Sequence, residues 1–366
     1  MEQASRGAVL VTGGAGYIGA HTAKALSEQG FLPVVFDNLS SGFRQAVRWG
    51  PFVHGDIRDG RAVREAIAAH GITQAIHFAG LIEVGRSVVR PDLFWEVNVA
   101  GTASLLDSLK ASGVSRLVFS STAAVYGQPQ GLSALDTLPE TLPLAPTSPY
   151  GDTKLACERM IAAHCAAFGL SAVALRYFNA AGADPSGLIG EAHDPETHLI
   201  PLAIRAAQGT GKPLTVFGTD YPTPDGACLR DYIHVRDLAA AHVAALAVDL
   251  PAGRFEAANV GTGRGYSVLQ VIEAVEAAVG RPAPRSIGPR RPGDPPSLVA
   301  DASRAAALLG WRPRNSSLEQ IVADAARWHA NQRYGAQSTL DVQTFKEQKY
   351  ASSIQEGSLR DASNAA

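Results

Sequence analysis

The sequence predicts an α/β protein in which a doubly wound parallel sheet is followed by a smaller mixed α/β lobe. Three observations support this fold class. An apolar run opens into a glycine-rich loop, an acidic residue closes the next apolar run, and apolar runs alternate with helical patterns through the first half of the chain. Alternating strands and helices form a parallel sheet that is covered by helices on both faces.

Length and composition limit the possible classes of protein. The chain has 366 residues, of which 46% are hydrophobic and 18% charged, and this suffices for a large core. A net charge of -2 without a long basic block argues against nucleic acid or an anionic membrane as a partner. The polar first residues do not resemble a signal peptide, and no apolar run approaches the length of a membrane span.

The cysteines indicate the compartment. Cys157, Cys165 and Cys228 form neither a metal-binding nor a redox motif. Such a sparse and odd set is typical of a reducing compartment, where a free cysteine behaves as a small hydrophobic residue. We therefore expect a cytoplasmic protein without a metal ion.

The first predicted strand, Ala8–Thr12, is a short apolar run of the kind that a buried parallel strand shows. It continues into a loop with glycines at Gly13, Gly14, Gly16 and Gly19, and a helical pattern then extends to Gly30. Glycines at this spacing allow a tight turn and a close approach of the backbone to a pyrophosphate at a helix N-terminus. A glycine motif alone is a weak signal, because any tight turn uses glycine.

The second predicted strand makes the signal specific. Residues 34–36 are apolar, and Asp37 ends the run where a carboxylate can accept hydrogen bonds from the hydroxyls of an adenosine ribose. The same carboxylate would repel a 2′-phosphate, which favours NAD over NADP. Loop and acid together predict a Rossmann-type dinucleotide site.

Further strands are predicted over residues 52–56, 74–78 and 116–119, with a helix from Arg61 to His70 after the first of them. Ligands bind at the carboxyl ends of such strands. The residues expected at these ends are Asp56, Ile57, Phe78, Ala79, Gly80 and Thr122. His54 and His77 lie within the predicted strands, and we expect them to be buried or hydrogen-bonded and not catalytic.

A candidate catalytic helix begins at Pro149, with Ser148 as its cap. Tyr150 and Lys154 stand four residues apart and therefore project from one face. An ammonium group beside a phenol favours the phenolate, so we expect Lys154 to lower the pKa of Tyr150 towards the range of a general base. A pair at this spacing is more often an exposed surface pair.

A hydroxyl at Thr122 and the phenol of Tyr150 can converge on one alcohol next to a bound nicotinamide. Removal of the O–H proton by a base, with hydride loss from the same carbon, is an oxidation of that alcohol. A dehydratase would need an acid after Thr122 to protonate a leaving hydroxyl. Ala123 and Ala124 provide none, which argues against dehydration.

The second half of the chain predicts a strand over residues 171–176 and then irregular spacing from Gly182. Residues 255–260 are strand-like and are expected to rejoin the large sheet, while Ser267 and Ser317 open helices with capping-box patterns. The expected organisation has a dinucleotide-binding domain over residues 1–180, to which residues 234–262 return, a mainly substrate-binding lobe over residues 181–334, and a disordered polar tail over residues 335–366.

Two arginines, Arg230 and Arg291, are candidate anchors for a substrate diphosphate, because guanidinium groups form bidentate hydrogen bonds to phosphate oxygens. Asn179 is expected near a phosphate or the sugar, and Asp294 near a ribose hydroxyl. The alternative for each arginine is an ion pair at the surface or between lobes. Arg290 is left open between phosphate and solvent, and three acids are expected to be structural: Asp225, Asp231 and Asp237.

Taken together, the motifs of this chain resemble those of the extended short-chain dehydrogenase/reductases, and within them the family of UDP-glucose 4-epimerases. The resemblance extends from about Ala8 to Trp328. It rests on the glycine loop and on residues 77–80, 121–127, 148–154, 176–179, 230–235 and 289–294, in that order.

The resemblance implies a role for each matching residue. Tyr150 would be the base, Lys154 its partner and a ligand of the nicotinamide ribose, and Thr122 the hydroxyl that shares a hydrogen bond with the sugar O4 and Tyr150. The implied NAD contacts are Gly13, Gly16, Tyr17, Ile18, Gly19, Asp37, Asn38, Asp56, Ile57, Phe78, Ala79, Gly80, Asn98, Thr122, Tyr150, Lys154, Tyr177 and Phe178. The implied substrate contacts are Thr122, Tyr150, Asn179, His198, Leu199, Phe217, Arg230, Tyr232, Arg291, Asp294 and Leu298.

Two positions depart from the family pattern. Ile82 stands where many members have a lysine that contacts the cofactor, and His198 stands where some have an asparagine. Leu298 occupies a position that gates the C2 side of the sugar, where a tyrosine disfavours N-acetylated sugars and smaller residues admit them. Leucine is intermediate.

The resemblance implies interconversion of UDP-glucose and UDP-galactose through transient oxidation at C4, with tightly bound NAD that is regenerated in each cycle. The alternatives are an epimerase for UDP-GlcNAc or UDP-xylose, a sugar-nucleotide dehydrogenase or decarboxylase, and a dinucleotide-binding regulator without catalysis. A homodimer is expected through the helices that contain Asn98 and Tyr150.

Overall fold

The computed structural model describes residues 6–129, 131, 133, 135–291, 293–331 and 334. The polar tail expected at residues 335–366 therefore lies outside the described residues. All elements described below belong to the unit that ends at Asn331.

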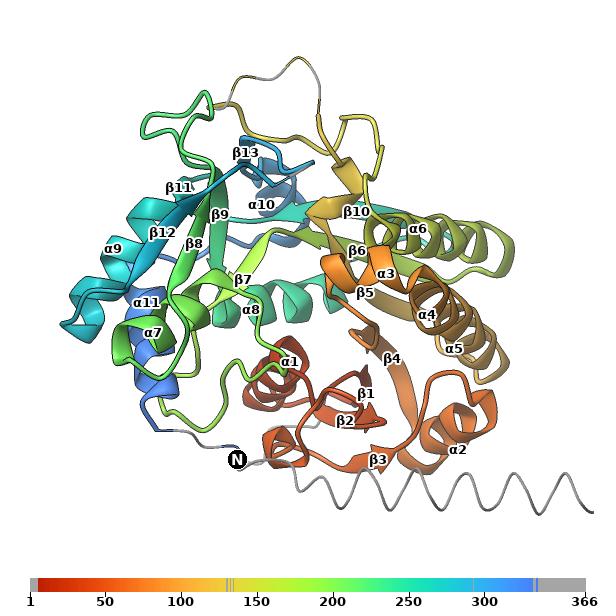
Figure 1. The fold of residues 1–366 in the computed structure, drawn as a ribbon. Coiled ribbons are helices and arrows are strands. Elements are labelled where there is room, and N and C mark those ends of the chain that lie inside the picture. Colours follow the sequence, from red (N-terminus) through yellow and green to blue (C-terminus); the bar gives the residue numbers. More distant parts are fainter. Residues whose placement is uncertain are drawn as a thin grey trace, which may run out of the picture. The chain divides into compact units, whose positions relative to one another are not determined.

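A seven-stranded sheet forms the larger part of this unit (Figure 1). Its strand order is β10-β6-β5-β4-β1-β2-β3, and every neighbouring pair is parallel. The strands are β1 (Ala8–Thr12), β2 (Leu32–Asp37), β3 (Phe52–His54), β4 (Ile72–His77), β5 (Arg116–Thr122), β6 (Ser171–Tyr177) and β10 (Phe255–Val260). The strands at the middle of the sheet are largely apolar because helices cover both of its faces.

Two sets of helices cover the two faces. Side chains of α2 (Gly60–His70), α5 (Gly101–Ala111) and α6 (Pro149–Phe168) pack with one face in a single apolar cluster. Those of α1 (Tyr17–Glu28), α8 (Val235–Leu246) and α10 (Ser303–Leu309) pack with the other face. The predicted doubly wound α/β fold is confirmed.

The helix starts expected from capping residues are confirmed as well. Ser148 Oγ accepts a hydrogen bond from Gly151 N at 3.2 Å, and Pro149 is the first residue of α6. Ser267 and Gln270 form a complete capping box at the start of α9 (Val268–Val279). Each cap satisfies backbone donors that a helix end leaves unpaired, and so fixes where the helix begins.

The strand order reverses next to β1, because the chain proceeds from β1 to β2 and β3 on one side and from β4 to β5 and β6 on the other. In open α/β sheets the crevice at such a reversal is where ligands bind. The loops that follow β1 and β4 meet there, which places the glycine loop and residues 78–80 side by side.

The rest of the unit is a smaller mixed α/β lobe. Strand β9 (Leu229–His234) is central: β7 (Asn179–Ala181) and β13 (Ser297–Leu298) pair with it in parallel and β11 (Gly265–Ser267) antiparallel. A separate parallel pair joins β8 (Leu214–Phe217) and β12 (Arg285–Gly288). Helices α7 (Leu199–Gln208), α9 and α11 (Leu318–His329) contribute to one apolar cluster with side chains of these strands.

Short elements complete the described structure: the helices α3 (Val84–Val89) and α4 (Pro91–Phe94), the 3-10 turns η1 (Arg44–Ala46) and η3 (Ala123–Tyr126), and the π-helical turn η2 (Trp95–Ala100). Among the described residues, no helix has the length and apolar character needed to span a bilayer.

The two strand histidines have structural partners, as expected. His77 is buried, with Nδ1 at 2.8 Å from Thr12 Oγ1 and Nε2 at 3.0 Å from Thr102 Oγ1. His54 Nε2 lies 3.3 Å from the carbonyl oxygen of Asn38. Burial lowers the pKa of His77 to about 3, so its imidazole is neutral at physiological pH.

Candidate active site

The glycine loop after β1 forms a cradle that side chains would fill. Gly13 has a φ of +70°, and a Cβ atom there would lie 2.6 Å from the backbone nitrogen of Ala79. A Cβ at Gly19 would lie 2.3 Å from the carbonyl oxygen of Gly13. Gly16 caps α1, whose first residues are Tyr17 and Ile18. The helix N-terminus therefore faces a tight, glycine-rich loop, which fits the pyrophosphate of a dinucleotide.

Acidic and amide side chains gather where β2 and β3 end. Asp37 Oδ2 accepts a hydrogen bond from Ala15 N at 3.0 Å, so its carboxylate lies against the glycine loop. Burial raises the pKa of Asp37, and hydrogen bonds from backbone amides act in the opposite direction. Asn38 Nδ2 donates to Asp56 Oδ2 at 3.0 Å. These three side chains thus lie together beside the loop, where the sequence predicts the adenosine ribose.

Asn98, in the π-helical turn η2, fixes the loop after β4. Its Oδ1 accepts from Leu81 N at 2.8 Å, and its Nδ2 donates to Leu81 O at 3.1 Å and to Thr153 Oγ1 at 3.2 Å. The side chain therefore ties the end of the Phe78-Ala79-Gly80 loop to helix α6. Ile57 packs in the core, and Ile82 is 39% exposed where a lysine is common in the resembling family.

The candidate catalytic residues come together at the end of β5. Thr122 is the last residue of that strand and Tyr150 lies in the first turn of α6, and the Thr122 hydroxyl is near enough to lower the pKa of the Tyr150 phenol. Lys154 Nζ donates to the carbonyl oxygen of Ser120 at 2.9 Å. Tyr177 pairs with Thr122 on the neighbouring strand β6, and its hydroxyl lies 2.7 Å from Ser120 Oγ.

The expected effect of Lys154 on Tyr150 is wrong in this structure. Burial raises the pKa of Tyr150 above its ordinary value, nearby Tyr177 adds to the rise, and the hydrogen bond with Thr122 acts against it. The ammonium group of Lys154 is engaged with Ser120, and burial lowers its own pKa to about 8. Helical spacing placed both residues correctly on one face, but the direction of the pKa shift depends on burial.

A buried ion pair supports this arrangement and was missed by sequence analysis. Glu158 and Arg176 form a bidentate pair, with Nε to Oε1 at 3.0 Å and Nη2 to Oε2 at 2.6 Å. Ser121 donates a short hydrogen bond to Glu158, and Arg176 donates to Tyr126 at 3.1 Å. Glu158 stands four residues after Lys154 on α6. This spacing puts it on the same helical face as Tyr150 and Lys154, and was the one sequence signal for a role near the site. The pair links the helix of Tyr150 to the strand β6.

On the lobe side, the diphosphate candidates have protein partners. Arg230 forms an ion pair with Asp294 and donates to the carbonyl oxygen of Pro295 at 3.0 Å. The guanidinium carbon of Arg291 lies 4.1 Å from the centroid of the Phe217 ring. The structure thus brings together the predicted contacts in two pairs, Arg230 with Asp294 and Arg291 with Phe217.

Strand register places the remaining lobe candidates. Leu298 pairs with Arg230, and Asn179 pairs with Tyr232, so β13, β9 and β7 carry these residues side by side. Asn179 Nδ2 donates to the carbonyl oxygen of Asp231 at 3.1 Å. Both Phe178 and Leu298 pack against the apolar cluster that contains Ala123, the residue after Thr122. The candidate gate for the sugar therefore lies near the end of β5.

The remaining sequence-based expectations in the lobe concerned His198, Leu199 and Arg290. Leu199 is the first residue of α7, and its cap His198 contacts Glu191 and Glu196 at 3.0 and 2.9 Å. Arg290, which the sequence left open, donates to Asp220 at 2.8 Å in an exposed pair.

The acids expected to be structural accept several hydrogen bonds. Asp231 accepts hydrogen bonds from the backbone amides of Thr262, Gly263 and Ala300. Asp237 accepts from Arg314 N and Ser316 Oγ, among others. Asp225 accepts from Ala227 N at 3.0 Å and from Ser267 Oγ.

A doubly wound sheet with a dinucleotide loop and a tyrosine–lysine helix defines a nucleotide-dependent enzyme of the short-chain dehydrogenase/reductase type. The sequence model of the NAD dependent epimerase/dehydratase family matches residues 9–261, which include all strands of the large sheet. The chain belongs to this family.

Within this family, the chain is similar to curated and structurally solved UDP-glucose 4-epimerases. A UDP-glucose 4-epimerase from Halalkalibacterium halodurans is 48% identical over 331 residues, covering 90% of this chain and 97% of the relative. The crystal structure of UDP-glucose 4-epimerase from Brucella ovis in complex with NAD is 48% identical, with a TM-score of 0.83, covering 88% of this chain and 98% of that chain. The enzyme from Bifidobacterium longum, solved with NAD+ and UDP, is 39% identical with a TM-score of 0.83, covering 90% and 99% of the two chains.

Proposed function

We propose that this protein is a UDP-glucose 4-epimerase that interconverts UDP-glucose and UDP-galactose and so serves galactose metabolism. The observation that carries the proposal is the proximity of Tyr150 and Thr122 at the carboxyl end of β5, in a sheet whose glycine loop fits a dinucleotide. The extent of the match supports it, since curated UDP-glucose 4-epimerases align over about nine-tenths of the chain.

In this reaction the chain moves a proton, and the bound NAD supplies a reversible hydride acceptor at C4 of the sugar. Tyr150 takes the proton of the O4 hydroxyl as the phenolate, with the neighbouring Thr122 hydroxyl as the relay. The positive charges of Lys154 and of an oxidised nicotinamide would favour this phenolate against the effect of burial. The 4-keto sugar turns over in the pocket, and Tyr150 returns the proton to O4 on the opposite face. The net redox change is zero, so NAD stays bound through the cycle.

While the sugar rotates, residues of the smaller lobe keep the UDP part of the substrate bound. Arg230 and Arg291 hold the diphosphate, with Asp294 on a ribose hydroxyl and Phe217 against the nucleotide. The strand register supports these roles, because Leu298 pairs with Arg230. The proposed sugar gate and the proposed diphosphate anchor are therefore neighbours. In this division of labour, residues 1–180 and 234–262 bind NAD and residues 181–334 mainly bind the UDP-sugar.

The breadth of sugar specificity follows from Leu298. Its side chain is intermediate in size and partly buried against the cluster that includes Phe178. UDP-GlcNAc/UDP-GalNAc epimerisation is therefore the second candidate activity, with the C2 substituent accommodated beside Leu298.

Purified protein without added NAD is expected to convert UDP-galactose to UDP-glucose, because the cofactor stays bound through purification and through turnover. Product is measured by chromatography, and the nucleotide released on denaturation is identified by mass. UDP-GlcNAc, UDP-xylose and UDP-glucuronate are assayed in parallel.

Three results would contradict the proposal. Failure to interconvert the two hexoses in the presence of added NAD would exclude the epimerase activity. Accumulation of NADH in proportion to substrate would indicate a dehydrogenase, and release of CO2 would indicate a decarboxylase.

We further propose a cytoplasmic homodimer. The three cysteines are free and buried, which suits a reducing compartment. Large apolar side chains are exposed on α3 and η2, namely Val84, Val88, Val89 and Trp95, next to the helices expected at the interface. Light scattering should give twice the chain mass, and Val89→Glu should lower it to one chain mass, whereas a wild-type monomer would contradict the dimer.

A further inference from the structure

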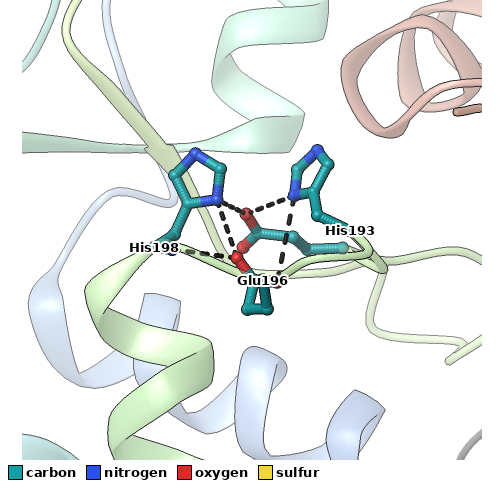
Figure 2. Close-up of side chains that lie close together, drawn as sticks. His193, Glu196 and His198 are labelled. Carbon is teal, nitrogen blue, oxygen red and sulfur yellow. Dashed lines mark hydrogen bonds and ion pairs between the residues drawn. The ribbon is translucent and has the colours of Figure 1, made fainter. Parts of the chain in front are cut away.

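Four potential metal ligands gather in the loop that precedes α7. They are Glu191, His193, Glu196 and His198, and one ligand atom from each lies within 4.8 Å of the others. Figure 2 shows the imidazole rings of His193 and His198 on either side of the carboxylate of Glu196. None of these side chains takes part in the chemistry proposed for Tyr150.

The spacing of the donor atoms suits a four-coordinate ion. His198 Nδ1 lies 3.0 Å from Glu191 Oε1 and 2.9 Å from Glu196 Oε1. His193 Nδ1 lies 3.2 Å from Glu191 Oε1 and 3.9 Å from Glu196 Oε2. In a tetrahedral zinc site with bonds of about 2.0–2.2 Å, neighbouring ligand atoms are about 3.3–3.6 Å apart. Three of the four distances are shorter than this spacing and one is longer, so small side-chain shifts would bring one atom of each residue to an ion.

Unsatisfied buried atoms give a second, independent observation. The Glu196 side chain has no exposed surface, and within the described structure its Oε2 has no hydrogen-bond donor. His193 Nδ1 is likewise buried without a hydrogen-bond partner among the described residues. A carboxylate oxygen and an imidazole nitrogen that are buried and face each other without a hydrogen bond are costly unless a further group joins them.

We propose that Glu191, His193, Glu196 and His198 bind one Zn²⁺ ion. Two imidazole nitrogens and two carboxylate oxygens match the preferences of zinc, whereas Mg²⁺ and Ca²⁺ favour sites made of oxygen alone. Two carboxylates balance the charge of the dication, and both imidazoles bind as neutral ligands. All four positions are filled by the protein, so the ion has a structural role.

The surroundings indicate what this ion holds together. The Tyr17 ring, at the start of α1, packs edge-on to the His193 ring with centroids 6.2 Å apart. Trp328 Nε1, from α11, donates to the carbonyl oxygen of Glu191 at 2.7 Å. His198 caps α7, whose first residue is Leu199. The zinc site would therefore join α1, the helix that follows the dinucleotide loop, to α7, the helix that begins at a candidate nucleotide contact.

A cluster without metal is the competing arrangement. Burial alone would lower the pKa of His198, but Glu191 and Glu196 raise it to about 10, so a protonated imidazole can balance part of the carboxylate charge. That arrangement leaves Glu196 Oε2 without a donor. Zinc binding and protonated His198 make opposite predictions for added metal.

The test measures bound zinc and melting temperature on the full chain, and so does not depend on the proposed epimerase activity. After treatment with a chelator, addition of ZnCl2 is expected to restore one zinc per chain and to raise Tm. Co²⁺ in place of zinc is expected to give the visible absorption of a four-coordinate ion. His193→Gln and Glu196→Gln should each weaken zinc binding by more than the roughly 10- to 100-fold that loss of an outer-sphere partner causes.

The controls separate this site from general effects of histidine loss. His164 is a matched residue, since its side chain is 19% exposed against 21% for His193 and its Nε2 lies 3.8 Å from Asp107 Oδ1. His164→Gln should keep the zinc-dependent rise in Tm. Glu196→Gln keeps an oxygen that can accept from the amides of Thr197 and His198, so it should fold. Absence of bound zinc with an unchanged Tm, or a rise that persists in both cluster variants, overturns the proposal.

Discussion

Replacement of Tyr150 by phenylalanine is expected to lower kcat for epimerisation by about 10²- to 10⁴-fold, the range for loss of a positioned general acid–base group. The ring is buried and packs edge-on to Phe94 with centroids 6.4 Å apart, so the phenylalanine fills the same space. Only the hydroxyl, and with it the interaction with Thr122, is removed. Turnover is measured with UDP-galactose, and the NAD retained after purification is measured in the same samples.

Two further variants serve as a control and a comparison for Tyr150→Phe. Tyr266→Phe removes a phenol that is as buried as Tyr150, at 7% exposure, but belongs to the cluster of the lobe, and it should retain activity. Thr122→Val should lower kcat by less than Tyr150→Phe, since it removes the relay and leaves the base. If Tyr150→Phe kept full turnover, Tyr150 would not be the base. Loss of NAD together with turnover would instead indicate a binding defect.

Truncation of Glu158 to alanine is expected to reduce the free energy of unfolding by about 3–5 kcal/mol, because it leaves the buried guanidinium of Arg176 without its counter-charge. Side-chain exposure in this pair is only 3% for Glu158 and 6% for Arg176. The variant also removes the acceptor of Ser121, next to Thr122. Urea unfolding followed by circular dichroism measures the change.

A double replacement separates loss of charge balance from loss of packing. Glu158→Leu combined with Arg176→Met should recover most of the stability, since a buried pair replaced by apolar residues of similar size is often neutral. Arg61→Ala removes an exposed ion pair with Glu65 and should leave the unfolding midpoint unchanged. A Glu158→Ala variant as stable as the wild type would show that Arg176 finds another partner.

Local sequence signals predicted much of the fold. Apolar runs identified the strands of the large sheet, and capping residues such as Ser148 and Ser267 set helix starts correctly, because both signals act over a few residues. Boundaries were less accurate: β4 begins at Ile72, two residues before the predicted run, and β5 extends to Thr122. Pairing with neighbouring strands sets these ends.

Two properties of the candidate site could not be predicted from the sequence: the direction of the pKa shift of Tyr150 and the ion pair of Glu158 with Arg176. Spacing correctly put Tyr150 and Lys154 on one helical face, but the pKa of Tyr150 moves the other way because burial outweighs a charge that is engaged with Ser120. Pairing of Glu158 with Arg176 is a contact between a helix and a strand, with no local signature.

The residues of the proposed zinc site are close in the sequence, unlike this pair. Glu191, His193, Glu196 and His198 stand within one loop, but the expectation of no metal ion rested on the cysteines alone.

The place of β10 in the large sheet has a consequence for synthesis on the ribosome. Strand β6 ends at Tyr177, and the edge strand that pairs with it begins at Phe255, after the first part of the lobe has been made. At about 5–20 residues per second, several seconds pass before that partner emerges. Throughout this interval β6 is an unpaired apolar edge, the kind of surface on which nascent chains associate. Chaperone binding to this protein should therefore be strongest on chains arrested between these two strands.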